Sequence, residues 1–181
     1  MSESNPALAR LMSRVSLGDR GAFQSLYEET SPHIMGLLQS MLSQRELAED
    51  VLQDTFVKVW HRAGDYHPGR GQVNTWIASI ARYGAIDAIR ANKVRRGSDD
   101  ALESIPDGAT QALDHIAGDQ DEQRLYQCLD TLSADQKQSI SLAFFRGYTH
   151  DELASQLATP LGTVKAWVRR GLKKLRECLD Q

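Results

Sequence analysis

An acidic segment near the middle of the chain is the feature that most limits how this sequence can fold. From Ser98 to Gln123 there is no lysine or arginine, and Pro106 interrupts the segment. A segment with so little to bury is expected to stay flexible and to separate two packed units. We therefore predict a linker over residues 97–121, between domains at residues 1–96 and 122–181. The acidic residues of the segment are Asp99, Asp100, Glu103, Asp107, Asp114, Asp119, Asp121 and Glu122.

The composition is typical of a globular protein. The chain has 181 residues, of which 41% are hydrophobic, and its 24 acidic and 21 basic residues give a net charge of −3. This balance excludes a protein that coats nucleic acid through its overall charge, although basic residues are concentrated near residues 90–96 and 165–176. No apolar run approaches the roughly 18 to 20 residues of a membrane span, and the start of the chain lacks the regions of a secretory signal. We predict a cytoplasmic protein.

The residue types that carry metal or catalytic chemistry form no convincing pattern. Cys128 and Cys178 are far apart and outside any CxxC or Cys/His cluster, which favours two free thiols. His61, Asp65 and His67 could be imagined as a metal site, but such a trio beside a loop is more typical of ordinary polar surface. There is no persuasive nucleophile triad, Walker loop or carboxylate pair. We expect no catalytic residue, no metal, no cofactor and no small-molecule substrate.

Helical periodicity dominates both halves of the chain, without strand alternation, and it predicts an all-α protein of two small domains. Three capping boxes predict where helices start. In each box a hydroxyl oxygen accepts a hydrogen bond from the backbone N–H three residues later, and the side chain of that later residue accepts one from the backbone N–H of the first. The boxes are Ser43 with Glu46, Ser133 with Gln136, and Thr149 with Glu152.

Two helices are predicted in the second part of the first domain. After Ser43, a polar stripe of Asp50, Asp54 and Lys58 lies opposite an apolar face. Residues 64–71 are typical of a loop, and a second helix is predicted over residues 72–91. The predicted apolar positions are Leu47, Val51, Leu52, Thr55, Phe56 and Val59 in the first helix, and Val73, Trp76, Ile77, Ile80, Gly84 and Ala88 in the second.

The segment from Thr149 to Cys178 has helix-turn-helix spacing. A short capped helix to about Leu157 is followed by a turn and a longer helix that could start at Pro160. Val164, Val168, Leu172 and Leu175 are predicted to face the domain, with Lys165, Ala166, Arg169, Arg170 and Lys173 facing outward. Such a face can enter a DNA major groove, where Lys and Arg reach guanine acceptors or phosphates. The alternative is an ordinary solvated basic helix.

Aromatic and basic residues alternate in the first domain. Trp60, Tyr66, Trp76 and Tyr83 are interspersed with lysine and arginine, a mixture suited to stacking unpaired bases while phosphates are neutralised. Aromatic residues at helical spacing are more often core, and Trp60 and Trp76 are expected to be at least partly packed.

Three ordered motifs together resemble the extracytoplasmic-function (ECF) sigma factors of bacteria. The first runs from Ala48 to Trp60, the second is Thr75 to Arg82 with Asp87 and Arg90, and the third runs from Gly162 to Arg170. The resemblance covers about residues 20–96 and 122–179. It implies a helical initiation factor whose first domain binds core RNA polymerase and opens the minus-10 element, and whose second domain reads the minus-35 element.

The resemblance also implies roles for individual residues and partners. It predicts an anti-sigma factor, often membrane-anchored in this family, as a further partner beside core polymerase and promoter DNA, and a place in a stress response. It assigns polymerase contact to Asp50, Gln53 and Asp54, minus-10 contact to Arg70, Trp76, Arg82, Tyr83, Asp87 and Arg90, and minus-35 contact to Thr163, Lys165, Ala166, Arg169, Arg170 and Lys173.

The chain departs from the family pattern at two places. Tyr83 stands where Asn is usual, and a phenol can stack on a base but cannot offer the paired donor and acceptor of an amide. Ala166 and Trp167 replace the common Ser-Arg pair, and Trp167 is expected to pack at the edge of the apolar face.

Two rival functions are a stand-alone helix-turn-helix regulator and a sigma-like module that binds an anti-sigma factor without engaging DNA. The polar stripe and the Trp76 to Arg90 helix argue against the first, and the basic face of the last helix argues against the second.

Overall fold

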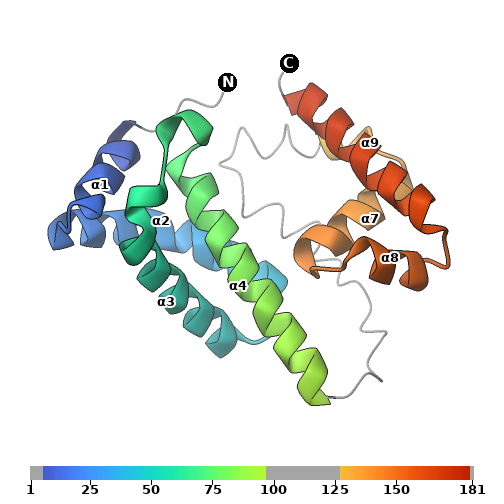
Figure 1. The fold of residues 1–181 in the computed structure, drawn as a ribbon, viewed down its shortest axis with the longest axis horizontal. Helices are drawn as coiled ribbons and strands as arrows, with labels where there is room; N and C mark the ends of the chain where they lie inside the picture. The colour runs from blue at the N-terminus through green and yellow to red at the C-terminus, as the bar shows by residue number, and fades with distance from the viewer. Residues whose placement is uncertain (1–5, 97–126, 180–181) are drawn as a thin grey trace. The chain divides into compact units, whose positions relative to one another are not determined.

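The computed structural model describes residues 6–96 and 127–179, and these residues form helices joined by short turns, without strands, as the all-α prediction required (Figure 1). The chain divides into two compact units, Met1–Ala101 and Leu102–Gln181. The predicted linker at residues 97–121 lies outside the described residues. None of the described helices combines the length and the apolar character that crossing a membrane demands.

Four α-helices make up residues 6–96, the described part of the first unit, and their apolar sides are turned toward one another. α2 (Arg20–Met41), α3 (Arg45–Arg62) and α4 (Val73–Arg96) pack mutually, and α1 (Pro6–Ser16) covers α2. Two short 3₁₀ turns, η1 (Ala63–Asp65) and η2 (Pro68–Arg70), connect α3 to α4. The core side chains that are almost fully buried include Met12, Leu26, Ile34, Leu37, Leu38, Val59 and Ile77.

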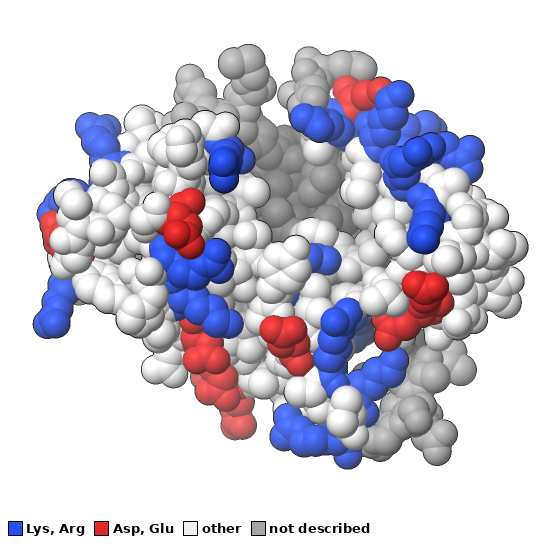
Figure 2. All heavy atoms as spheres, viewed as in Figure 1, with Lys and Arg blue, Asp and Glu red and all other residues white. Residues whose placement is uncertain are grey.

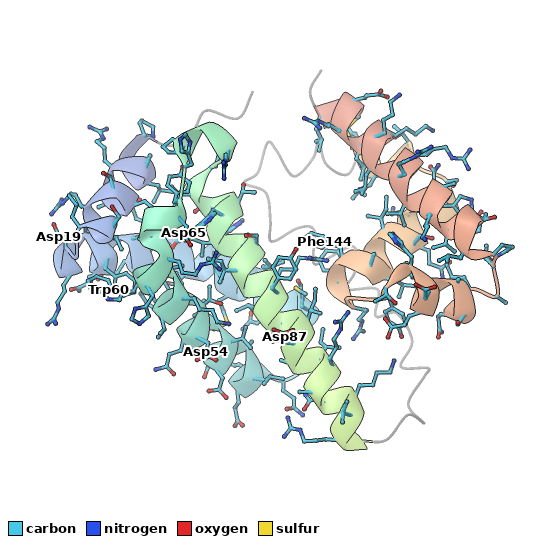
Figure 3. The ribbon with its side chains drawn as sticks, in the orientation of Figure 1. Asp19, Asp54, Trp60, Asp65, Asp87 and Phe144 are labelled. Atoms are coloured by element: carbon cyan, nitrogen blue, oxygen red, sulfur yellow. A yellow bond between two sulfur atoms is a disulfide. The ribbon has the colours of Figure 1, made fainter. Side chains whose placement is uncertain are left out.

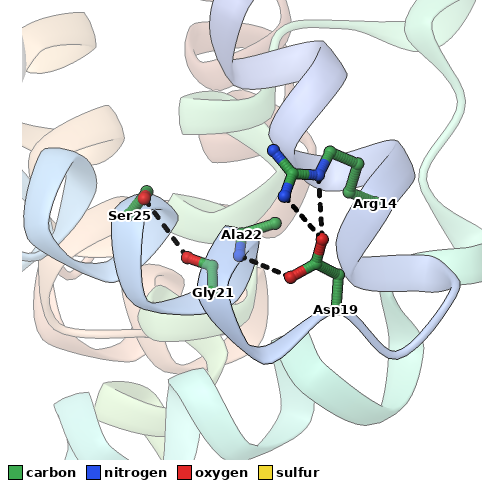
Figure 4. Close-up of polar contacts among 5 residues, drawn as sticks. All are labelled: Arg14, Asp19, Gly21, Ala22 and Ser25. Atoms are coloured by element: carbon green, nitrogen blue, oxygen red, sulfur yellow. Dashed lines mark hydrogen bonds and ion pairs between the residues drawn. The ribbon is translucent and has the colours of Figure 1, made fainter.

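Asp19 begins α2 and ties it to α1 (Figure 4). Its Oδ1 accepts a hydrogen bond of 2.9 Å from the Ala22 N–H, which satisfies one of the free donors at the helix start. Its Oδ2 accepts bonds of 2.9 and 2.6 Å from Nε and Nη2 of Arg14. The Ala22 bond and then the Arg14 guanidinium lower the pKa of this carboxyl. The turn between the two helices is therefore held by one carboxylate.

The predicted apolar face of α3 is confirmed, but its predicted capping box at Ser43 is wrong. The N-cap is Gln44, with no side-chain capping bond, and the Ala48 N–H donates to the Gln44 carbonyl at 3.1 Å. The first helical turn therefore starts one residue later than a box at Ser43 requires. Buried residues of α3 are Ala48, Val51, Leu52, Thr55, Phe56 and Val59.

The second unit has a helical turn at residues 127–130, then α7 (Ala134–Phe145), α8 (His150–Gln156) and α9 (Leu161–Leu179). Both predicted capping boxes of this unit are confirmed, with Ser133 and Thr149 as N-caps. Leu142, Leu153 and Val164, one from each helix, form the centre of the core. The three helices are thus joined by a small shared core and by well-capped starts.

The prediction of two free thiols is wrong, because Cys128 and Cys178 form a disulfide. Their Cα atoms are 5.7 Å apart although the residues are separated by 50 positions in the sequence. The bond joins the helical turn at 127–130 to the end of α9. Sequence spacing gave no sign of it, because the packing of α9 on α7 brings the two residues together.

Candidate nucleic-acid and protein interfaces

The outer face of α3 carries the predicted polar stripe. Asp50, Gln53 and Asp54 are all exposed, as Figure 3 shows for Asp54. Val57, one turn further along, is 52% exposed and lies on the same face. A single exposed apolar side chain is common on protein surfaces, so Val57 adds an apolar contact to this polar face without marking a partner site by itself. The sequence pattern missed Val57, although its position off the buried stripe could have indicated it.

Aromatic residues join α2 to α3 beneath this face. The Phe23 ring lies edge-on to Trp60 at 5.2 Å between centroids and to Phe56 at 6.3 Å, and Tyr27 meets Phe56 at 4.7 Å. Such edge-to-face pairs stabilise packing beyond the apolar area that they bury. Trp60 therefore belongs to the packing of the unit, in agreement with the expected partial burial.

The connection between α3 and α4 is organised around Tyr66. Its hydroxyl donates to the Gly71 carbonyl at 3.1 Å, and its ring lies edge-on to Trp76 at 6.0 Å. Burial raises the pKa of the Tyr66 phenol, which keeps the donor protonated. Gly71 has φ +147°, a conformation that residues with a Cβ rarely adopt. The loop thus has a defined shape in front of α4.

Two of the three polar residues beside this loop, Asp65 and His67, have partners within the protein. Asp65 pairs with Arg62 at 3.0 Å, and Nδ1 of His67 accepts a bond of 3.1 Å from the Gly69 N–H. His61 is exposed on α3. In the part of the chain that the structure describes, no group of three or more such ligands could hold a metal ion.

One face of α4 carries most of the residues assigned to the minus-10 element. Trp76, Tyr83, Asp87 and Arg90 follow helical spacing along the side of α4, and Figure 3 marks Asp87 on it. Tyr83 is 64% exposed, whereas Trp76 is half-buried against Tyr66. The most accessible flat ring on this face is therefore Tyr83.

Two arginines border this face in different ways. Arg82 is half-buried, its guanidinium carbon lies 5.6 Å from the centre of the Tyr83 ring, and burial lowers its pKa. This contact favours one orientation of the Tyr83 ring. Arg70 is exposed in η2, at the loop.

The predicted helix-turn-helix is present in α8 and α9. Ala158, in the turn, has φ +47°, and the Thr159 N–H donates to the Ala154 carbonyl at 3.0 Å. α9 starts at Leu161, where the Pro160 carbonyl accepts bonds from the Thr163 and Val164 N–H groups. The turn thus satisfies the backbone groups at both helix ends.

The outward basic face of α9 is confirmed, and Figure 2 shows lysines and arginines gathered over this helix. Trp167 packs beside the core of the unit, as expected. Thr163 and Ala166 are half-buried at the edge of the face. The exposed cations assigned to DNA are Lys165, Arg169, Arg170 and Lys173.

The predicted burial of Leu172 is wrong, because this side chain is 52% exposed. Gly171 is buried in its place, against α7: a Cβ on Gly171 would lie 2.6 Å from Cδ1 of Ile140 and 3.3 Å from Cβ of Gln136. The absence of a side chain lets α7 approach at this position, so Leu172 faces the solvent beside the cations. Val164 is buried, and Val168 and Leu175 are half-buried.

Three basic side chains of α9 have partners that restrict them. Arg170 Nε donates to the Ala166 carbonyl at 3.3 Å, and Lys173 pairs with Glu177 at 3.5 Å. Lys174 donates to the Thr131 carbonyl at 3.2 Å, which ties α9 to the start of the unit. Lys174 therefore holds the fold together, whereas Lys173 keeps an exposed ammonium.

Comparison with known proteins gives matches over both units. Residues 26–95 match the family model of Sigma-70 region 2, and residues 122–175 match that of Sigma-70, region 4. The ECF RNA polymerase sigma factor SigK of Mycobacterium ulcerans is 34% identical, over 96% of this chain and 94% of the relative. SigK of Mycolicibacterium vanbaalenii is 30% identical, over 95% of this chain and 89% of the relative. A solved structure, Rhodobacter sphaeroides SigE in complex with the anti-sigma ChrR, is 31% identical with a TM-score of 0.47, covering 97% of this chain and 99% of that one.

Proposed function

Because the chain belongs to the ECF sigma factors of RNA polymerase, we propose that it binds the core enzyme, recognises promoters and opens DNA without catalysis of its own. We assign core binding and opening of the minus-10 element to a region 2-like domain at residues 1–96. Recognition of the minus-35 element is assigned to a region 4-like domain at residues 122–181, and an acidic linker at 97–121 joins the two. The observation that carries the proposal is the pair of exposed faces, polar on α3 and basic on α9, within the two matched regions.

Core polymerase is proposed to contact the outer face of α3. Asp50, Gln53 and Asp54 supply charge and hydrogen-bonding groups there, and Val57 supplies an exposed apolar centre. A surface with an apolar centre and a polar rim is the usual composition of a protein interface. The packing of Phe56 against α2 keeps this face rigid, which lowers the entropic cost of binding.

The minus-10 element is proposed to bind along α4 and the preceding loop. Tyr83 offers an exposed ring for an unpaired base, and Arg82 limits the orientations of that ring. Arg70 and Arg90 are exposed and suited to phosphates, while Asp87 offers an acceptor to a base amine. Trp76 has a positioning role in this proposal, since its ring supports Tyr66 and the loop.

The minus-35 element is proposed to bind the start of α9. Lys165 and Arg169 lie one turn apart near that start, where a recognition helix meets base edges. Ala166 lets the helix approach closely, and Thr163 lies in the first turn. Arg170 and Lys173 are placed to meet phosphates, which fix register without reading sequence.

Regulation by an anti-sigma factor, action in the cytoplasm and a place in a stress response are proposed from family membership. Covering either exposed face, on α3 or on α9, would block one of the two steps above. An anti-sigma factor need only compete for one of these surfaces.

Run-off transcription with core polymerase tests the proposal on the DNA upstream of this protein's own gene. We expect promoter-dependent transcripts only when the protein is added. A variant with Asp50→Lys and Asp54→Lys should bind core polymerase more weakly, as measured by fluorescence anisotropy. Its helicity should be unchanged. The charge-matched control is Glu28→Lys with Glu29→Lys, on α2, which should bind normally. Absence of transcripts with intact core binding, or unchanged core binding in both variants, would contradict the assignment.

A further inference from the structure

The exposed face of α9 combines an apolar side chain with cations in a way that DNA binding alone does not explain. Leu172 is 52% exposed, three residues after Arg169 and next to Lys173. It lies seven residues, or about two helical turns, after Lys165, and these residues share one side of the helix. Leucine cannot bind a phosphate. A ligand that combines apolar side chains with carboxylates would match this face better than DNA does.

The described part of the second unit begins next to the C-terminal half of α9, on the side of the helix turned away from this face. The Cα atoms of Cys128 and Cys178 are 5.7 Å apart, and Lys174 Nζ donates to the Thr131 carbonyl at 3.2 Å. Both contacts join residues 128–131 to the C-terminal half of α9. The start of the described part of this unit, at residue 127, therefore lies near the end of α9.

The sequence that precedes this point has the composition that the face requires. No lysine or arginine occurs from Ser98 to Gln123, while the described part of α9 has Glu177 as its sole acidic residue. Leu113 and Ile116 are interspersed with the acids. The carboxylates nearest to residue 127 are Asp107, Asp114, Asp119, Asp121 and Glu122.

The chain before residue 127 is long enough for its carboxylates to reach the exposed face of α9 in the same molecule. The rise of an α-helix places Lys165 about 20 Å from Cys178 along α9. Each residue of an extended chain can span about 3.3 Å, so the eight steps from Asp119 to residue 127 can cover about 26 Å. Asp107 and Asp114 lie further back in the sequence, and their longer tethers are enough to pass around a helix about 10 Å wide. Carboxylates of the segment can therefore reach every cation of the face. The tether also gives them a high effective concentration that a separate acidic peptide would not have.

We propose that residues 107–122 bind in cis to the face of α9 formed by Lys165, Arg169, Leu172 and Lys173, and that they compete with DNA for it. A second copy of α9 is a poor occupant, because cations would face cations. The competition rests on the proposed function of α9 in DNA binding, whereas the binding in cis does not. The free protein would thus bind stray DNA weakly until another partner displaces the segment.

Paramagnetic broadening in the full chain tests the binding in cis. A nitroxide is attached at Ala117→Cys, with Cys128 and Cys178 kept in their disulfide. We expect the amide signals of Arg169 to Lys173 to broaden, and about 0.5 M salt to reduce the effect by screening. The broadening should be lost in a variant with Asp119→Asn, Asp121→Asn and Glu122→Gln, and kept in a control with Glu28→Gln, Glu29→Gln and Glu46→Gln.

Affinity for a random-sequence DNA duplex tests the competition. We expect the variant neutralised at residues 119, 121 and 122 to bind about tenfold more tightly than the control, although both have lost three negative charges. A Leu172→Ser variant should also lose broadening, and its helicity shows whether it remains folded.

Three outcomes would overturn the proposal. These are equal broadening in the neutralised variant and the control, equal DNA affinity of the two, and broadening between separately labelled chains, which would make a second copy the occupant. Loss of run-off transcription with the broadening intact would instead remove the proposed function and leave the binding in cis standing.

Discussion

Lys174 and Thr131 are joined by a hydrogen bond of 3.2 Å from the ammonium to the backbone carbonyl, across 43 residues of sequence. The neighbouring Lys173 pairs within its own helix, with Glu177 at 3.5 Å. Two adjacent lysines of a basic helix therefore serve different purposes. Lys174 stabilises the unit, and Lys173 remains available to a phosphate.

Replacing each of these lysines by methionine should separate the stabilising role of Lys174 from the proposed DNA contact of Lys173. We expect Lys174→Met to lower the free energy of unfolding of the second unit by about 1 kcal/mol, because a carbonyl loses its donor. Lys173→Met should leave stability unchanged and weaken binding to all DNA sequences alike, with a salt slope reduced by about one. Thermal unfolding and DNA titrations at several salt concentrations measure both. Equal stability of the two variants would contradict the distinction.

Gly171 should resist substitution because α7 lies against it. We expect Gly171→Leu to cost about 1 to 3 kcal/mol of unfolding free energy, since the added atoms must displace Ile140 and Gln136. Gly162 is a matched control on the same helix, as nothing lies within 4 Å of the place its Cβ would take. Gly162→Ala should be neutral or stabilising by up to about 1 kcal/mol. Chemical denaturation of both variants checks this, and a tolerated leucine at 171 would refute the close packing.

The disulfide should contribute strongly to the stability of the second unit. Closing a loop across 50 residues is worth about 4 kcal/mol through the entropy of the unfolded chain. We expect a variant with Cys128→Ser and Cys178→Ser to unfold at a lower temperature, with the first unit unaffected. Calorimetry with and without a reductant measures the effect, and the double variant should not respond to reductant. An unchanged unfolding temperature of the second unit in the double variant would show that the disulfide does not stabilise it.

The Asp19 carboxylate should make the stability of the first unit depend on pH. Its pKa lies below 3.8 in the folded protein, because it accepts the Ala22 bond and pairs with Arg14. Its charge therefore stabilises the fold above pH 3.8, and this contribution is lost as the pH falls through the folded pKa. Asp19→Asn keeps a capping acceptor but not the charge. We expect it to be less stable than the parent at pH 7, with the difference shrinking below about pH 3.8. If urea unfolding gives the same stability difference between the variant and the parent at every pH, the charge of Asp19 does not explain that difference.

Tyr83 should matter for opening DNA more than for first binding it. Stacking on one base contributes about 1 to 3 kcal/mol, and it requires a base that has left the duplex. We expect Tyr83→Ala to slow open-complex formation on a duplex promoter and a pre-melted promoter to rescue it substantially. Tyr83→Phe keeps the ring and should behave like the parent. Permanganate footprinting measures the opened bases, and an equal defect on both templates would remove the stacking role.

Short-range patterns in the sequence were sufficient to predict most of the helices. The boxes at Ser133 and Thr149 form as their four-residue pattern predicts. The same pattern at Ser43 shows that a complete pattern is not sufficient by itself. The box at Ser43 did not form, since α3 starts its first turn at Gln44. The outward positions of Lys165 and Arg169 were also predictable, because each lies about 100° around the helix from the valine before it, away from the buried stripe.

The sequence by itself determined two helical regions, the capped starts in the second, and the polar and basic faces of α3 and α9. Only the tertiary structure decided the pairing of Cys128 with Cys178, the use of Lys174 as a tether and the exposure of Leu172. The physical reason is the distance over which each interaction acts. Capping and amphipathic spacing depend on residues three or four positions apart, whereas the side of α9 that is buried depends on how closely α7 approaches Gly171.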